Sequence, residues 1–205
     1  MPGRNIRKVD VANSYYHVYA RGVNKQVLFR DERDFVFFIS ILERYLSDFG
    51  ATRRHGPDYP KYYDDIQLLS YCLMPNHFHL LVLQINEKAM TKLLHAVMTS
   101  YASYFNKRYK RSGPLFESRY RASHITSDGY LLHISRYIHL NPHEWRHYRY
   151  SSLQSYVDEK PPKWLSTGPI SNLFTSAGEY LTFHKDYEQR KGELEYIKHE
   201  LANND

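Results

Sequence analysis

The chain of 205 residues contains one cysteine, Cys72, and this scarcity excludes an internal disulfide framework. Cys72 stands in an apolar run, where a small buried thiol is the ordinary interpretation. No apolar run approaches the roughly 18 residues that a membrane-spanning helix needs. The polar and basic N-terminal segment "MPGRNIRKVD" also lacks the apolar core of a signal peptide. We therefore expect a protein of the reducing cytoplasm with no membrane partner.

Positive charge is in moderate excess. Lysine and arginine number 28 against 22 aspartate and glutamate residues, which gives a net charge of +6 and a pI of about 9.2. This excess favours a polyanionic partner, with nucleic acid as the leading class. The sequence also has 20 tyrosines. Aromatic faces among basic side chains are surfaces on which unpaired bases stack, although most tyrosines in any protein simply pack.

Apolar residues alternate along several short segments and recur at intervals of three and four along others, which indicates strands and amphipathic helices. The predicted order is strand, helix, strand, strand, helix, strand. This order favours an α+β fold with a ferredoxin-like (RRM-like) antiparallel sheet and helices on one face, so the other face would be open for chemistry. The segments, in order, are 14–22, 31–50, 66–74, 77–84, 87–111 and 112–126, with a loop expected at 51–65. The last segment is expected to be a turn followed by a strand.

A third helix is expected after this sheet, because Ser127 is a suitable N-cap and Pro142 would stop the helix. The residues beyond it are rich in turn formers, and the tail that follows could form one or two helices. We predict one domain over residues 1–157 and a helical C-terminal extension over residues 158–205, whose role the sequence does not indicate.

Two histidines, His77 and His79, stand inside an otherwise apolar strand segment. Because side chains alternate along a strand, both histidines share one face while Phe78 turns to the other. The two neutral imidazoles would be roughly 6–7 Å apart along the strand and could converge on one divalent cation. Histidine pairs on a sheet face are more often solvated or hydrogen-bonded, so a third ligand is needed to choose between the two interpretations.

The third helix offers such a ligand. Tyr137 and Asn141 are four residues apart and therefore neighbours on one helical face, and an amide oxygen can coordinate a hard metal ion. A tyrosine beside such an ion could attack a phosphate that the ion polarises. Tyr137 could equally pack the helix on the sheet, and the spacing alone does not decide. Tyr130, seven residues earlier, lies roughly on the same face and is also compatible with a nucleophile.

Five stretches, taken together, resemble one known family. "MPNHFHLLV" resembles the His-hydrophobic-His motif of HUH single-strand nucleases, and "RYIHLNP" resembles the tyrosine motif of the REP-associated tyrosine transposases, which act on repetitive extragenic palindromes. The segments "YHVYARGVNKQVLFRDERDF", "GPLFESRYRA" and "YRYSSLQSYV" match in the same order. The resemblance covers about residues 15–157. Tyr150 departs from it, because the closing segment more often has tryptophan there.

The resemblance implies a role for each motif residue. His77, His79 and Asn141 correspond to ligands of Mg²⁺ or Mn²⁺, and Tyr137 corresponds to the nucleophile. The implied enzyme is an HUH tyrosine transposase, a site-specific nuclease and strand transferase that cleaves and rejoins single-stranded or hairpin DNA through a 5′-phosphotyrosine intermediate. A monomer and a homodimer are both compatible with it. The hairpin and guide sequence that it recognises are not implied.

Two other functions stay open at this point. One is a domesticated nucleic-acid-binding protein that does not cleave, and the other is a metal-dependent phosphodiesterase that uses water. A covalent protein–DNA adduct would distinguish the transposase from both. Several basic residues flank the predicted sheet and are expected to contact backbone phosphates, although a solvated basic surface explains them nearly as well. They are Arg108, Lys110, Arg111, Arg119 and Arg121.

Overall fold

The computed structural model describes residues 10–48, 58–158 and 160–189. Its centre is a four-stranded antiparallel sheet with the strand order β2-β3-β1-β4. Together with the order of elements along the chain, this is the ferredoxin-like arrangement, so the predicted α+β fold is confirmed. The strands are Ser14–Arg21 (β1), Ile66–Met74 (β2), His77–Gln84 (β3) and Arg121–Ile125 (β4).

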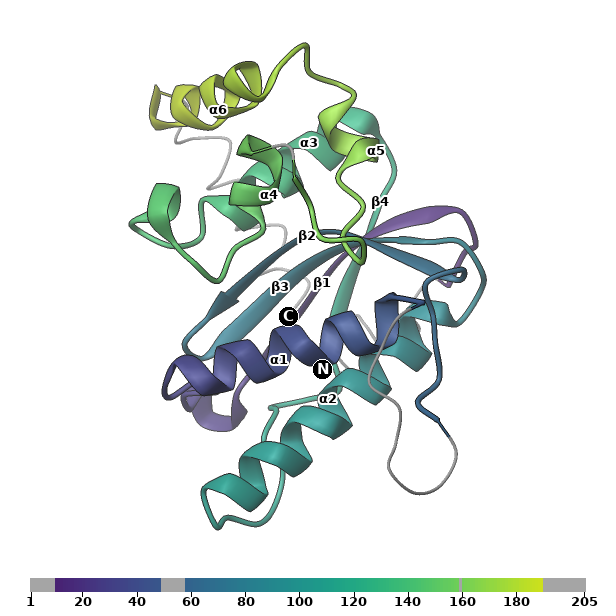
Figure 1. The fold of residues 1–205 in the computed structure, drawn as a ribbon, viewed down its shortest axis with the longest axis vertical. Coiled ribbons are helices and arrows are strands. Elements are labelled where there is room, and N and C mark those ends of the chain that lie inside the picture. The colour runs from purple at the N-terminus through teal and green to yellow at the C-terminus, as the bar shows by residue number, and fades with distance from the viewer. Residues whose placement is uncertain (1–9, 49–57, 159, 190–205) are drawn as a thin grey trace, which may run out of the picture.

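Two long helices cover one face of the sheet, as Figure 1 shows. They are α1 (Glu32–Leu46) and α2 (Ala89–Arg108). Three large aromatic rings meet where these helices cross β3: Phe38 lies 5.1 Å from Phe78 and 5.0 Å from Tyr101, and all three side chains are fully buried. Aromatic rings bury more area than other apolar side chains, so this cluster anchors the helical layer on the sheet.

The opposite face is only partly open, because a second group of helices packs on it (Figure 1). Leu81 and Cys72 of the central and edge strands are fully buried on this face against Ile134 and Ile138. The near-continuous apolar runs of β2 and β3 explain the difference, because strands that are apolar on both faces need cover on both. The helices of this layer are α3 (Asp128–His139), α4 (Leu153–Val157), α5 (Gly168–Ser171) and α6 (Ala177–Lys185).

The part of the predicted extension that the structure describes packs against the edge strand β2. Leu165 forms a parallel bridge with Leu68, and the indole of Trp164 lies 5.8 Å from the ring of Tyr71. Helix α4 ends at Val157, and the domain boundary predicted there stays a prediction. The rest of the expected tail helix and residues 51–57 of the expected loop lie outside the described residues. Short 3₁₀ turns occupy Val23–Lys25, Trp145–His147 and Asp186–Gln189.

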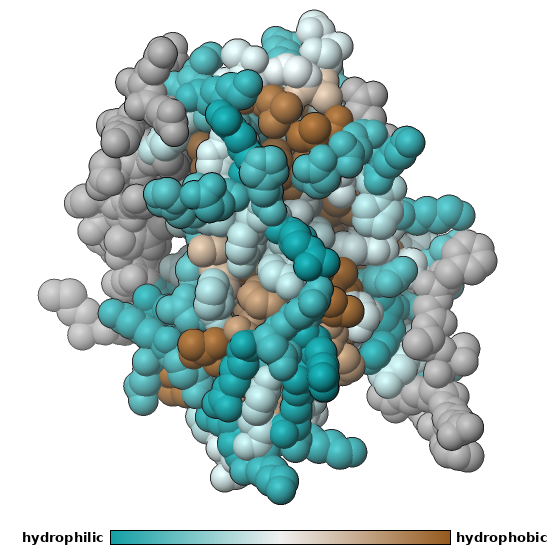
Figure 2. All heavy atoms as spheres, turned by 60° about the vertical axis from the view of Figure 1, so that its left-hand side comes forward, coloured by the Kyte–Doolittle hydropathy of each residue, from teal (hydrophilic) through white to brown (hydrophobic). Residues whose placement is uncertain are grey.

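The face drawn in Figure 2 is mostly hydrophilic, and its apolar areas are interrupted by polar side chains. In the described part of the chain, no helix is long and apolar enough to cross a membrane. The large apolar side chains that are exposed lie far apart in the sequence and are Val11, Val27, Val36, Tyr63 and Leu173.

A buried polar network fixes the C-terminal end of α3. His139, the last residue of α3, makes hydrogen bonds through both ring nitrogens, to the Ser152 hydroxyl at 2.8 Å and to the Tyr180 hydroxyl at 2.9 Å. The Tyr180 hydroxyl also lies 2.6 Å from the Ser135 hydroxyl. Hydrogen bonds in a dry interior are costly to break, because each leaves an unsatisfied polar atom. Helix α6 of the predicted extension therefore holds α3 in place.

Buried histidines should make the fold sensitive to acid. Burial lowers the pKa of His184 to about 4 and that of His17 to about 3, and it holds the pKa of His139 well below its ordinary value. Histidines in an unfolded chain titrate at about pH 6.5, so below that pH the unfolded state binds more protons than the folded state. The free energy of unfolding should therefore be highest above about pH 6.5 and fall toward pH 4.

Each such histidine should contribute about 1.4 kcal/mol per pH unit within this window. Urea denaturation between pH 7 and 4.5 measures the slope, and His184→Gln should flatten it by about that amount. His143→Gln is the matched control, because its side chain is 98% exposed. Equal flattening in both variants would show that burial of His184 is not the cause.

Candidate active site

Four residues predicted from the sequence come together where the start of β3 faces the end of α3. The His77 and His79 rings are 4.9 Å apart, and the Tyr137 ring lies 5.4 Å from that of His79 in an edge-on arrangement. Asn141 lies two residues after the end of α3, and its Oδ1 atom lies 3.2 Å from Nε2 of His77. The site is therefore built from a strand of one layer and a helix of the next.

The turn before His77 is held by backbone contacts to the segment after β1. The Gly22 amide donates to the Asn76 carbonyl at 2.9 Å, and the Leu28 amide donates to the Pro75 carbonyl at 2.7 Å. A Cβ at Gly22 would lie 2.3 Å from the Gln26 carbonyl oxygen, so only glycine fits this position. These contacts set the position of Asn76, whose side chain in turn contacts the His77 ring.

The surroundings of His77 suit a cation. Burial lowers the pKa of His77, so the ring is neutral at neutral pH and carries one N–H. Its Nδ1 atom lies 2.7 Å from Oδ1 of Asn76, the shorter of its two contacts with amide oxygens. If Nδ1–H donates there, the Nε2 lone pair faces the oxygen of Asn141. Two acceptors that face each other need a shared proton or a cation, so the donor set fits a metal ion.

The donor set contains no carboxylate. Among the described residues, no group of three or more histidine, cysteine, aspartate or glutamate side chains could hold a metal ion. The candidate set of His77, His79 and Asn141 therefore relies on an amide oxygen as its third member and carries no negative charge. Such a set is uncharged until an anionic group joins it.

Sequence reasoning missed two residues of this site, His17 and Tyr19. His17 is fully buried, and its Nε2 atom lies 2.9 Å from Nδ1 of His79. Tyr19 is the register partner of His79 on β1, and its ring lies 5.8 Å from that of His79. The alternation of His17, Tyr19 and Arg21 in "HVYAR" was the available signal. Its meaning depends on β1 lying beside β3, which only the sheet topology gives.

Tyr137 is held among the histidines. Its ring also lies 5.8 Å from that of His17, again edge-on. Burial raises the pKa of Tyr137, and a hydrogen bond with Asn141 partly offsets this rise by favouring the phenolate. The alternative candidate, Tyr130, lies in the first turn of α3, roughly 10 Å away along the helix axis. The geometry favours Tyr137 over Tyr130 as the residue next to the proposed ligands.

The five basic residues predicted to contact DNA do not share one surface. Arg121 lies beside the site, where its Nη1 group donates to the Tyr19 hydroxyl at 3.4 Å and its guanidinium lies 5.9 Å from the Tyr19 ring centre. Arg111 instead donates to Asn106 Oδ1 at 3.1 Å and to the Pro114 carbonyl. Lys110 and Arg119 are exposed. Of these four, Arg121 is the one that contacts a residue of the site.

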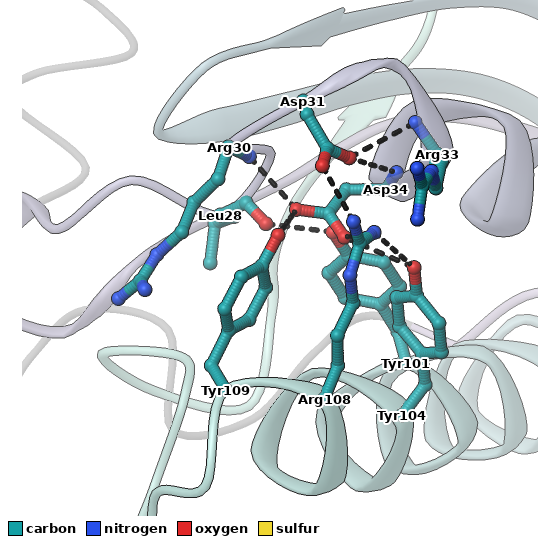
Figure 3. Close-up of polar contacts among 9 residues, drawn as sticks. All are labelled: Leu28, Arg30, Asp31, Arg33, Asp34, Tyr101, Tyr104, Arg108 and Tyr109. Atoms are coloured by element: carbon teal, nitrogen blue, oxygen red, sulfur yellow. Dashed lines mark hydrogen bonds and ion pairs between the residues drawn. The ribbon is translucent and has the colours of Figure 1, made fainter.

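Arg108 has a structural environment (Figure 3). It donates to Asp34 Oδ1 at 2.7 Å and pairs with Asp31, the N-cap of α1. The other Asp34 oxygen accepts from the Tyr109 hydroxyl at 2.7 Å, and Asp34 is fully buried. Arg108 therefore joins the end of α2 to the start of α1, and two carboxylates neutralise its charge. A contact between Arg108 and DNA stays a prediction, and this environment does not favour it.

Comparisons with known proteins were made for the whole chain. Residues 61–141 match the model of the family described as "Transposase IS200 like". The match includes the two histidines, Tyr137 and Asn141, and it confirms the resemblance predicted from the motifs. It supports a transposase or DNA-processing role for the protein. No match was found among curated protein sequences.

A solved structure also resembles the chain. It is described as the structure of the REP-associated tyrosine transposase bound to a REP hairpin. The TM-score is 0.55 at 12% sequence identity, and the alignment covers 78% of this chain and 89% of that chain. At this identity the comparison establishes a shared fold, and it extends the likeness well beyond the transposase match at residues 61–141.

Arg121 and Arg108 give a test of the predicted DNA-binding residues. Arg121→Ala should weaken binding of a single-stranded oligonucleotide and make the dependence of log K on log salt less steep by about 0.7. Arg108→Ala should keep the salt dependence but lower the thermal midpoint, because Asp34 would stay buried without its cation. Fluorescence anisotropy at several salt concentrations and thermal unfolding measure the two effects. The reverse pattern would show that Arg108, and not Arg121, contacts the phosphates.

Proposed function

We propose that this protein is a metal-dependent single-strand endonuclease and transposase that cleaves and rejoins DNA at hairpin or palindromic elements. The observation that carries the proposal is the convergence of His77, His79, Tyr137 and Asn141 at one place between β3 and α3. The transposase match over residues 61–141 supports the same reaction class. The net charge of +6 is consistent with a nucleic-acid substrate.

In this proposal, Nε2 of His77, Nε2 of His79 and Oδ1 of Asn141 would hold Mg²⁺ or Mn²⁺. Nε2 is the remaining ligand atom of His79, because Nδ1 is engaged with His17. The bound ion would polarise the scissile phosphate and stabilise charge that develops on its oxygens. Two imidazoles in the set favour Mn²⁺ over Mg²⁺ in affinity, because imidazole nitrogen is a softer donor than oxygen.

In the proposed chemistry at Tyr137, one ester bond to phosphorus is exchanged for another. The Tyr137 oxygen attacks the phosphorus, the bond from phosphorus to the 3′ oxygen breaks, and the 3′ oxygen leaves as a hydroxyl after taking a proton. The product is a 5′-phosphotyrosine link that keeps the energy of the phosphodiester. Attack by another 3′-hydroxyl reverses the step and joins the strands without ATP. The hydrogen bond from Asn141 favours the phenolate that the attack requires.

The proposed substrate is single-stranded or hairpin DNA, approaching the side of the site that β1 and β4 form. The half-buried ring of Tyr19 lies there beside the guanidinium of Arg121. An aromatic ring next to a cation suits an unpaired nucleotide, because the base stacks on the ring and the phosphate pairs with the cation. The DNA would enter where the second helical layer leaves the sheet uncovered.

Tyr137→Phe tests the nucleophile, because it removes one oxygen and keeps the ring. The variant should bind a hairpin oligonucleotide as the wild type does but form neither cleaved strand nor covalent adduct, a loss of at least about 10³-fold in rate. Tyr130→Phe is the matched control and should cleave normally. Denaturing gels with labelled palindromic oligonucleotides in Mn²⁺ measure cleavage and adduct together.

Each other result has a distinct meaning. Cleavage that survives in Tyr137→Phe and disappears in Tyr130→Phe would identify Tyr130 as the nucleophile. Cleavage without an adduct in both variants would indicate a phosphodiesterase that uses water. Binding without cleavage by the wild type would indicate a nucleic-acid-binding protein that does not cut.

The metal ligands have a separate test. His77→Ala and His79→Ala should each lower the cleavage rate by about 10²-fold or more, since each removes one of three protein ligands. Oligonucleotide binding in EDTA should stay near that of the wild type. His147→Ala, which changes an exposed histidine, serves as the control. Undiminished cleavage by either ligand variant at limiting Mn²⁺ would remove that histidine from the metal site.

A further inference from the structure

We propose that His17 is a positioning residue for the metal site, because it accepts the Nδ1 hydrogen of His79 and so keeps the Nε2 lone pair of His79 available to the cation. The inference rests on the proposed function and deepens it. His17 contributes no ligand atom in this arrangement. Its effect reaches the cation through the ring of His79.

The geometry of the two rings supports a directed hydrogen bond. The Nε2 atom of His17 lies 2.9 Å from Nδ1 of His79, the ring centres are 5.1 Å apart, and the ring planes differ by 14°. With so short an N–N distance at this separation of centres, both nitrogens must lie near the line that joins the centres. The bond therefore lies close to the plane of both rings, where the imidazole lone pair and the N–H bond point.

The proton position in this bond decides what His79 can do. A neutral imidazole has one N–H and one lone pair. If His79 donates from Nδ1, its Nε2 atom keeps a lone pair and can bind a cation. If His17 donates instead, His79 must carry its hydrogen on Nε2, and that atom cannot be a ligand. Ligation through Nε2 thus requires His17 to be the acceptor.

The surroundings keep His17 in this orientation. Its ring lies 5.7 Å from that of Tyr19 and 5.8 Å from that of Tyr137, and it is fully buried. Among the described residues, its Nδ1 atom has no hydrogen-bond partner. Burial of an unsatisfied polar atom destabilises a fold, so an apolar side chain would serve packing better here. The one polar contact that His17 makes in the described structure is the contact with His79.

Two substitutions separate this role from packing. His17→Phe keeps a ring but removes the acceptor, whereas His17→Gln places a carbonyl oxygen near the position of Nε2. Electron paramagnetic resonance gives the dissociation constant for Mn²⁺ alone. His17→Phe should raise it about 10–100-fold, the usual effect of losing an outer-shell partner, and His17→Gln should restore most of the affinity. A purely structural role would predict no such rescue at equal thermal stability.

His124→Phe is the matched control. It removes a histidine of β4 that is the register partner of Tyr16, and the two rings lie 5.2 Å apart on the other face of the sheet. Mn²⁺ affinity should be unchanged in this variant. Unchanged affinity in His17→Phe, with affinity lost in His79→Ala, would overturn the role of His17 and leave the metal site standing. No Mn²⁺ binding by the wild type would overturn the metal site and this inference together.

A second measurement needs no variant and applies even where His17→Phe does not fold. Long-range proton–nitrogen NMR correlations report which imidazole nitrogen carries the hydrogen. In wild-type protein with Mg²⁺, His79 should carry it on Nδ1 and His17 should also carry it on Nδ1. A hydrogen on Nε2 of His79 under these conditions would overturn the inference.

Discussion

The pairing of β1 with β3 at the centre of the sheet is the constraint on which the rest of the structure depends. Its register sets Tyr19 opposite His79 and Arg21 opposite His77. A shift by one residue would turn every side chain of one strand to the opposite face. The apolar face of β3 prevents such a shift, because Phe78, Leu80 and Val82 must point at the long helices. The aromatic core thus aims the two histidines at the opposite face.

The candidate site lies on the sheet face that helices α3 to α6 cover only in part. Helix α3 packs on β2 and β3 through Ile134 and Ile138, and its end carries Tyr137 to the histidines. The network from His139 to Tyr180 fixes this end against α6. The C-terminal segments therefore have a role in the geometry of the site, although they lie outside the transposase match at residues 61–141.

Much of this could be predicted from the sequence, since the signals were local. The Ser127 N-cap and the strand segments 66–74 and 77–84 are found as predicted. The His-x-His alternation and the i, i+4 spacing of Tyr137 and Asn141 named candidate residues, and the fold brings them together. His17 was missed because its partner is on another strand, 62 residues away. The ion pair of Arg108 with Asp34 was missed for the same reason, because a charge in a basic cluster does not reveal a distant buried carboxylate.

The uncharged donor set of His77, His79 and Asn141 has a consequence for control of the proposed reaction. Without a carboxylate, the proposed site would offer a divalent cation little electrostatic attraction, and a DNA phosphate would supply the missing negative charge. The bound cation would then raise the affinity of the protein for the DNA strand, and the bound strand would raise its affinity for the cation by the same factor, as thermodynamic reciprocity requires. In the proposed enzyme, the metal site would therefore be most fully occupied when cation and single strand are present together.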